Sequence, residues 1–246
     1  MLNKFKLKLI RYTFNSHFIG IFINIFYLDR AEVYKSLRKN AHYAKGRLLD
    51  VGCSNKPYQN LFDVDQYIGL EIDTLENRKN KEADFFYDGN NFPFDPESFE
   101  TVLTSQVLEH VFNPKDFLIN INRVLVSGGY LLLTVPFLGD EHEKPYDFGR
   151  YTSFGLKHLI ECHGFEVVNY QKTTVGFSSI MQLIINYLNK YIAKTPKFIG
   201  WPCQIIIASF FNPIALIIGF LLPKNEDFFL GSTLVAQKVK TVLIND

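Results

Sequence analysis

Short apolar segments alternate with amphipathic ones along most of the chain, and this alternation constrains the fold more than any other feature. Five apolar runs bounded by Gly, Asp, Asn or Pro are expected to be strands, at residues 47–52, 67–72, 83–87, 101–105 and 130–135. Two more are expected at 165–171 and 232–239. Runs this short and this apolar are typical of parallel strands that are buried on both faces. The pattern predicts an α/β protein with a Rossmann-like, doubly wound sheet.

Helix signals separate these strands. Asn113 is a suitable N-cap and Pro114 a suitable first helical residue. Apolar residues then recur at helical spacing, at Phe117, Leu118, Ile121, Val124 and Leu125. We expect this helix to end at Gly128 and Gly129, and further helices at 31–43 and 153–163.

The strand–helix alternation stops in residues 173–230. This stretch contains the uncharged run 205–222, which is close to the minimum of about 17–20 residues for a bilayer-spanning helix. Pro213 predicts that the run forms two short helices, which cover the sheet or lie in a membrane interface. We therefore expect four regions: a basic, aromatic and helical N-terminal segment (1–44), a core (45–172), an apolar helical insertion (173–230), and a final strand with a tail (231–246).

Charge and cysteine usage narrow the class of protein. The net charge of +1 gives no global field that would attract nucleic acid, so we expect no nucleic-acid partner. Cys53, Cys162 and Cys203 form no CxxC pair, which predicts neither a metal site nor a redox motif and suits a reducing cytoplasm. Arg11 interrupts the N-terminal apolar residues, and we expect no signal peptide.

The N-terminal segment and the insertion favour contact with a membrane. Lys4, Lys6, Lys8 and Arg11 are interleaved with large apolar residues, a composition that suits an anionic lipid surface. We expect a cytoplasmic protein that contacts the cytoplasmic face of the membrane peripherally. The alternative is that the insertion is a lid or a dimer surface, on which the N-terminal segment packs.

A glycine turn follows the first expected strand, in LLDVGCSNKPY (48–58). Gly52 would let the backbone approach a ligand closely. A dinucleotide loop requires G-x-G-x-x-G, but Ser54 and Pro57 stand at the second and third glycine positions. The carboxylate of Asp50 would repel a pyrophosphate and suit a ligand that carries an ammonium group. The alternative is a structural turn with a capping aspartate.

Polar side chains also follow the next three expected strands. Glu71 lies about 20 residues after the glycine turn, where an acid can accept both hydroxyls of a ribose, and Asp73 is the alternative. Asp88 is placed to meet an adenine amino group or to cap a turn, and Ser105 and Gln106 would stand beside the same crevice. The carboxyl ends of parallel strands share one edge, so together these residues predict a nucleoside site. The isolated histidine of the following LEHV segment, His110, is expected to be structural.

Four stretches resemble motifs of class I S-adenosylmethionine-dependent methyltransferases of the type 11-like group: DVGCSNKPY, YIGLEID, DGNNFPFDPESFETVLTSQVLEHV and INRVLVSGGYLLLTVPF. The resemblance covers residues 45–170 and implies a seven-stranded sheet whose last strand is antiparallel. It also implies S-adenosylmethionine as the cofactor, with Asp50 and Gly52 at its methionine end, Glu71 at the ribose, Asp88 at the adenine and Gln106 beside the crevice. The sequence departs from the pattern at Ser54, where the second loop glycine is usual.

The segment after the fifth strand, residues 139–159, is expected to lie over the methyl-donor face. It is similar to a segment of methyltransferases encoded among surface-polysaccharide genes. A hydroxyl acceptor needs a base, for which His142 is the first candidate and Asp147 the second. Tyr146 and Arg150 are expected to bind the acceptor, and Arg150 suits an acidic sugar or a phosphate. The alternative is a solvated loop with an Asp147–Arg150 pair.

Together, these features predict a methyltransferase that acts on an oxygen of a small-molecule, glycan or lipid-linked acceptor, in polysaccharide biosynthesis. A second hypothesis is a non-catalytic, membrane-associated module with a degenerate nucleoside pocket, which only Ser54 favours. A third is an NAD-dependent sugar-modifying enzyme, which Asp50 and the broken glycine pattern oppose.

Overall fold

The computed structural model of the 246-residue chain describes residues 16–242. Lys4, Lys6, Lys8 and Arg11, on which the predicted membrane contact partly depends, lie outside the described residues.

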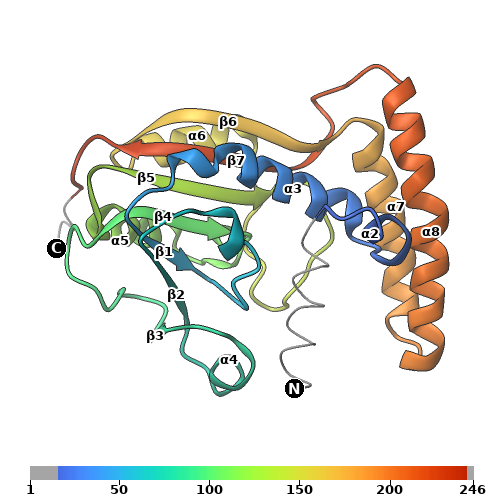
Figure 1. Ribbon diagram of the computed structural model, residues 1–246, viewed down its shortest axis with the longest axis horizontal. Coiled ribbons are helices and arrows are strands. Elements are labelled where there is room, and N and C mark those ends of the chain that lie inside the picture. The colour runs from blue at the N-terminus through green and yellow to red at the C-terminus, as the bar shows by residue number, and fades with distance from the viewer. Residues whose placement is uncertain (1–15, 243–246) are drawn as a thin grey trace. The chain divides into compact units, whose positions relative to one another are not determined.

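One sheet organises the fold (Figure 1). Its strands are β1 (Arg47–Val51), β2 (Gln66–Ile72), β3 (Phe85–Tyr87), β4 (Phe99–Ser105), β5 (Leu125–Pro136), β6 (Phe165–Val175) and β7 (Phe229–Lys238). They lie in the order β3-β2-β1-β4-β5-β7-β6. Strand β1 pairs in parallel with β2 and β4, and these pair in parallel with β3 and β5. The last strand, β7, is antiparallel, which confirms the predicted sheet.

Helices and short 3₁₀ turns connect the strands. The helices are α2 (Gly20–Ile23), α3 (Tyr27–Asn40), α4 (Leu75–Asn80), α5 (Pro114–Val124), α6 (Ser153–Glu161), α7 (Phe177–Ile192) and α8 (Lys197–Leu221); the 3₁₀ turns are η1 (Ala41–Tyr43), η2 (Gln59–Leu61) and η3 (Leu108–His110). Helix α5 begins at Pro114 as predicted but ends before Gly128 and Gly129, because Leu125 already pairs with Phe99 of β4.

The main core lies against the sheet. Leu49, Leu131 and Leu133 form one buried cluster with residues of α5 and α6 such as Leu118 and Ile160. The neighbouring strand residues Leu48, Leu103, Leu132 and Val235 point to the opposite face and are also fully buried. Both faces are therefore covered, as the near-continuous apolar strands predict.

The chain divides into two compact units, and each is described by itself. Among the described residues, the first contains 16–36 together with Phe137–Glu141 and Lys172–Gly231. The second contains Leu37–Pro136, His142–Gln171 and residues 232–242. The N-terminal segment and the apolar insertion, expected from the sequence as separate regions, thus belong largely to one unit.

Helix α8 corrects one prediction. The sequence predicts two short helices that break at Pro213, but α8 is a single helix that contains both Pro202 and Pro213. A proline removes one helical hydrogen bond, and packing within the first unit compensates for this loss. Ala208 and Ala215 of α8 are fully buried with residues of α2 and α7. The amide of Asn212 donates hydrogen bonds of 2.9 Å to the carbonyls of both Ile21 and Asn24.

Candidate functional site

The glycine turn after β1 is tightly packed. Gly52 has a φ of 73°, and a Cβ at this position would lie 2.4 Å from Cγ2 of Val107. Only glycine avoids both the backbone strain and the clash. Ser54, which replaces the second loop glycine, also has a positive φ, of 48°. Its backbone N–H donates a 3.0 Å hydrogen bond to Oε2 of Glu71, so the end of β2 holds the strained loop in place.

Two carboxylates flank this turn. Asp50 is 3% exposed, and Oδ2 accepts a 2.6 Å hydrogen bond from the Tyr67 hydroxyl. Burial raises the pKa of Asp50 to about 7; the Tyr67 hydrogen bond opposes this shift, and the negative charge of Glu71 adds to it. Two buried acids side by side stabilise a bound cation and repel a phosphate. The sequence-based argument for an ammonium-bearing ligand therefore has an electrostatic basis in the structure.

Asn55, in the same loop, offers one more polar group. Its Oδ1 is buried and has no hydrogen-bond partner among the described residues. A buried acceptor without a donor is costly, and a ligand hydroxyl or ammonium would satisfy it. Asp50, Glu71 and this oxygen are three hydrogen-bond acceptors at the ends of β1 and β2. The ammonium group and the ribose hydroxyls of S-adenosylmethionine are donors that such acceptors can bind. The residues present thus fit that cofactor.

The other predicted cofactor residues already have partners within the protein. Asp88 is exposed, and its Oδ1 accepts the backbone N–H groups of Asn90 and Asn91 at 2.9 and 3.1 Å. The Ser105 hydroxyl and the Gln106 amide both contact Oγ1 of Thr134, at 2.8 and 3.2 Å. Gln106 also has a positive φ, of 57°, directly after β4. The structure thus gives Asp88 a turn-capping contact, and fixes Ser105 and Gln106 at the carboxyl ends of β4 and β5.

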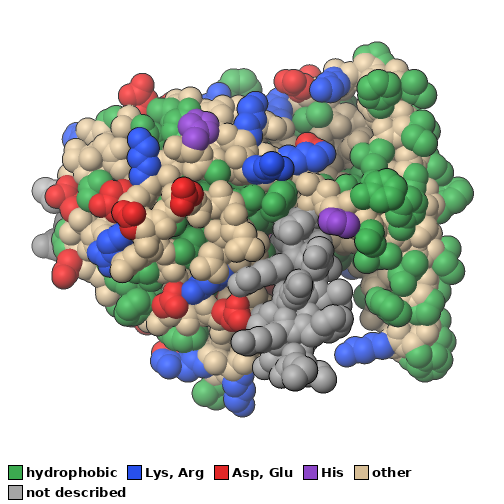
Figure 2. Space-filling model, in the orientation of Figure 1, with side chains coloured by type: hydrophobic (Ala, Val, Ile, Leu, Met, Phe, Trp, Pro, Cys, Tyr) green, Lys and Arg blue, Asp and Glu red, His purple; other side chains and the backbone are tan. Residues whose placement is uncertain are grey.

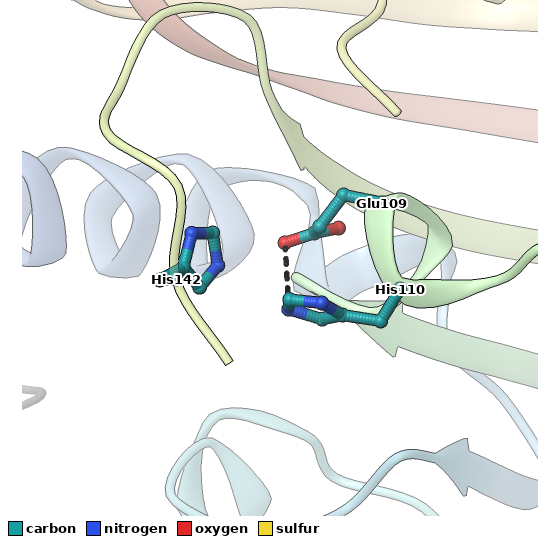
Figure 3. Close-up of side chains that lie close together, drawn as sticks. All are labelled: Glu109, His110 and His142. Atoms are coloured by element: carbon teal, nitrogen blue, oxygen red, sulfur yellow. Dashed lines mark ion pairs between the residues drawn. The ribbon is translucent and has the colours of Figure 1, made fainter. Parts of the chain in front are cut away.

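Glu109, His110 and His142 converge near the same ends of the strands (Figure 3). One ligand atom from each lies within 4.8 Å of the others. Glu109 is fully buried, and burial raises the pKa of its carboxyl to about 8. The ring of His110 meets that of His142 edge to face, with 4.8 Å between centroids. His110, expected to be an isolated structural residue, is therefore part of a cluster.

The segment that carries His142 is fixed to η3. The N–H groups of Phe148 and Gly149 donate to the carbonyl oxygen of Glu109, at 2.8 and 3.1 Å. Asp147 accepts two hydrogen bonds from Arg150, at 2.5 and 2.7 Å, and one of 3.0 Å from the N–H of His142. The Arg150 guanidinium holds the pKa of Asp147 well below its usual range. Asp147 is therefore a poorer proton acceptor than His142, although the sequence suggests both.

Exposed aromatic side chains adjoin this cluster. Phe112, Tyr146 and Phe148 are 82%, 63% and 47% exposed, and Phe148 contacts the other two rings edge on. The backbone carbonyl of Tyr146 contacts His110 directly. Clustered exposed aromatic side chains are a common feature of binding surfaces.

The segment that carries these residues has known relatives. Residues 49–133 match the family described as "Methyltransferase domain". This stretch of the chain is therefore similar to a methyltransferase domain. The match spans β1 to β5 and therefore includes Asp50, Glu71 and the η3 cluster residues Glu109 and His110.

Solved structures share the fold of this chain. Phosphoethanolamine N-methyltransferase 2 of Haemonchus contortus, solved with S-adenosylmethionine, is 17% identical, with a TM-score of 0.56 over 94% of this chain and 59% of that one. An S-adenosylmethionine-dependent methyltransferase of Thermotoga maritima is 18% identical, with a TM-score of 0.52 over 93% and 99%. The [4+2]-cyclase SpnF is 17% identical, with a TM-score of 0.55 over 84% and 80%. At such identities the likeness concerns the fold, which can host different reactions.

A curated relative matches part of the chain. An uncharacterized protein of Methanocaldococcus jannaschii is 30% identical over 111 residues, 42% of this chain. The match spans about half, 53%, of that relative's length.

Sequence reasoning missed two residues of the candidate site. Tyr67 lies in an expected strand, but its hydroxyl also donates a hydrogen bond to Asp50. Glu109, in the LEHV segment beside His110, is not singled out by the sequence, although it is fully buried. A carboxylate inside an otherwise apolar LEHV segment is the signal that could have identified it, because charged residues are rarely buried without a partner.

Proposed function

We propose that the protein transfers the methyl group of S-adenosylmethionine to an oxygen of a small-molecule, glycan or lipid-linked acceptor. The observation that carries the proposal is the buried acid pair Asp50 and Glu71 at the glycine turn of a methyltransferase domain. An NAD-dependent reaction is disfavoured, because this pair would lie close to a pyrophosphate.

Residues of this chain would bind the cofactor and remove the proton of the acceptor. Asp50 would bind the ammonium group and Glu71 the ribose hydroxyls. S-adenosylmethionine, when bound, supplies a methyl carbon already activated by a sulfonium. His142 would accept the proton of the acceptor hydroxyl, because the Arg150 guanidinium lowers the pKa of Asp147 and makes that carboxylate a weak base. Positioning of the acceptor would supply much of the remaining rate enhancement.

The acceptor class is inferred from the surface beside His142. Phe112, Tyr146 and Phe148 offer exposed aromatic faces, on which a sugar ring or an isoprenoid chain could pack. Arg150 is engaged with Asp147, so a direct contact with an acidic sugar would have to use its remaining donors.

We also propose that α8 contacts a lipid bilayer peripherally, on the cytoplasmic face. By length and composition α8 could span a membrane, with a mean hydropathy of 2.0, and only 17% of its most apolar window is buried. Figure 2 shows hydrophobic side chains along its length. The more exposed ones are Phe198, Trp201, Ile206, Phe210, Ile217, Phe220 and Leu221. The core helix of a soluble protein would bury most of these, and a bilayer contact would bring a lipid-linked acceptor to the protein.

The first experiment combines binding with turnover. Calorimetry with S-adenosylmethionine, S-adenosylhomocysteine and NAD⁺, in detergent, identifies the cofactor. Incubation with methyl-labelled S-adenosylmethionine and separate lipid and glycan extracts then tests transfer. We expect micromolar binding of the first two ligands, transfer to one extract, and loss of transfer in His142→Ala. Binding without transfer to any extract would support the non-catalytic module, and binding of NAD⁺ alone would overturn the proposal.

A further inference from the structure

The fully buried carboxylate of Glu109 is the starting point for this inference. Neither Oε1 nor Oε2 has a hydrogen-bond partner among the described residues, and the side chain is 0% exposed. A buried carboxylate without donors is strongly disfavoured unless a proton or a cation accompanies it. Two imidazoles, those of His110 and His142, lie within 4.8 Å of this carboxylate, and both can bind a cation.

The ring of His110 directs Nε2 toward Glu109. Its Nδ1 lies 2.7 Å from the carbonyl oxygen of Tyr146. A carbonyl can only accept, so Nδ1 must carry the proton, and the neutral ring then has its lone pair on Nε2. This Nε2 lies 3.8 Å from Oε1 of Glu109 and 3.9 Å from Oε2 of Glu143. A histidine held by a backbone carbonyl in this way is typical of a metal ligand.

His142 completes the cluster from the other side of Glu109. Its Nδ1 lies 3.5 Å from Oδ2 of Asp147, and Arg150 fixes that carboxylate. A carboxylate behind a histidine orients the ring and raises the basicity of its other nitrogen. Each of the two histidines therefore has an oxygen acceptor near Nδ1, which is the Tyr146 carbonyl for His110 and the Asp147 carboxylate for His142.

We propose that Glu109, His110 and His142 bind a divalent transition-metal ion of the Zn²⁺ class. Two imidazoles and one carboxylate are a donor set that Zn²⁺ and its first-row neighbours use in sites with open positions. Mg²⁺ and Ca²⁺ favour oxygen ligands and are poorly matched to it. The three ligand atoms lie within 4.8 Å of one another. Bonds from such ions to imidazole nitrogen and carboxylate oxygen are roughly 2.0–2.2 Å long, so the three ligand atoms would have to draw closer together around an ion. The side chain of His142, which is 41% exposed, is the most exposed of the three and the one with most freedom to move. This proposal replaces the expectation, based on cysteine pairs, that the chain has no metal site.

A bound ion would also affect deprotonation of the methyl acceptor. This consequence rests on the proposed function. An acceptor hydroxyl on an open coordination position would have a lowered pKa and could lose its proton to solvent. His142 would then act as a ligand rather than as a proton acceptor. Ion binding itself requires neither the cofactor nor an acceptor, so its measurement is independent of whether the proposed function holds.

The test uses the full chain after treatment with a chelator. Titration with Zn²⁺ against a chromophoric competitor gives the affinity and stoichiometry, and Co²⁺ gives a visible absorption spectrum that reports on the ligand set. We expect one ion per chain, with visible Co²⁺ bands. Glu109→Gln and His142→Ala should each weaken binding by roughly 100-fold or more, since loss of even an outer partner costs about 10–100-fold. Asp147→Asn should weaken it less.

Two controls keep the result interpretable. His42→Ala removes an imidazole that is not part of the cluster and should leave the affinity unchanged. His142→Ala alters a partly exposed side chain and should fold even where Glu109→Gln does not, as circular dichroism would show. The proposal is overturned if Zn²⁺ does not bind, if His142→Ala binds it as the unaltered protein does, or if Mg²⁺ binds in its place.

Discussion

Oε2 of Glu71, at the end of β2, accepts the backbone N–H of Ser54 at 3.0 Å. This bond ties the proposed ribose-binding acid to the loop position where the sequence departs from the family pattern. Ser54 is held in the left-handed region, with a φ of 48°, without the conformational freedom of glycine. Glu71 therefore has two roles, in loop geometry and in the proposed cofactor binding.

Removing the Glu71 carboxylate should weaken cofactor binding. For Glu71→Ala we expect a loss of about 1.5–3 kcal/mol, or roughly 10- to 100-fold in Kd, from the loss of hydrogen bonds to a charged group. Calorimetry with S-adenosylhomocysteine measures this change. Asp73→Ala is the matched control, because Asp73 is the alternative acid at this strand end and is engaged with Arg78 on the surface. Equal losses in both variants, or a larger one in Asp73→Ala, would contradict the assignment.

Cofactor binding should depend on pH through Asp50. Its pKa of about 7 means that the carboxyl must lose a proton before it can pair with an ammonium group. Affinity should therefore rise by roughly tenfold from pH 6 to pH 8, with release of a proton below pH 7. Calorimetry in buffers of different ionisation enthalpy detects that proton. In Asp50→Asn the dependence should disappear; an unaltered pH profile would assign it to another group.

The same carboxyl should affect the stability of the ligand-free protein. In the folded chain the pKa of Asp50 is raised to about 7 from its ordinary value of 3.8. Its contribution to the free energy of unfolding is thus fully present below about pH 4 and is lost as the pH rises toward 7. Urea unfolding across this range should show a decline that is smaller in Asp50→Asn. An equal decline in both proteins would mean that Asp50 is ionised in the folded state.

Gly52→Ala should destabilise the protein by both strain and steric overlap. The left-handed backbone alone costs a residue with a Cβ about 1–2 kcal/mol, and contact with Val107 should add about 1–3 kcal/mol. Gly89→Ala is the matched control, since Gly89 has a φ of 89° and nothing lies within 4 Å of the added Cβ. Adding Val107→Ala should recover part of the steric contribution. Equal unfolding midpoints for the two glycine variants would show that the contact with Val107 is not rigid.

Trp201 can report the proposed membrane contact, because it is the only tryptophan of the sequence and is 68% exposed on α8. Addition of lipid vesicles should shift its fluorescence to shorter wavelength, as the indole leaves water. Phe220→Asp, at a side chain that is 88% exposed, should weaken this response. A response restricted to anionic vesicles would implicate the basic N-terminal residues. No shift and no co-sedimentation with any vesicle would favour a lid or a dimer surface.

The sequence by itself determined the order of strands and helices. Strands such as 130–135 are largely apolar runs, and Asn113-Pro114 marks a helix start, so local pattern and backbone chemistry suffice to predict them. The sequence also indicated the acidic character of the β1–β2 edge. The antiparallel last strand followed from the family resemblance rather than from any local signal, and the position of β7 between β5 and β6 comes from the structure alone.

Only the tertiary structure decided the features that depend on contacts between distant residues. Pro213 interrupts a helix by its own chemistry, yet α8 remains one helix because Asn212 hydrogen-bonds carbonyl groups more than 180 positions away, at 188 and 191 residues. Asp147 resembles a base in the sequence, but the Arg150 guanidinium lowers its pKa and makes it a weak proton acceptor. Glu109 and His142 are not close in the sequence, and contacts such as the backbone bonds from Phe148 and Gly149 to Glu109 bring their segments together. The burial and the pKa of a side chain depend on neighbours that are distant in the sequence, so a local sequence pattern does not reveal them.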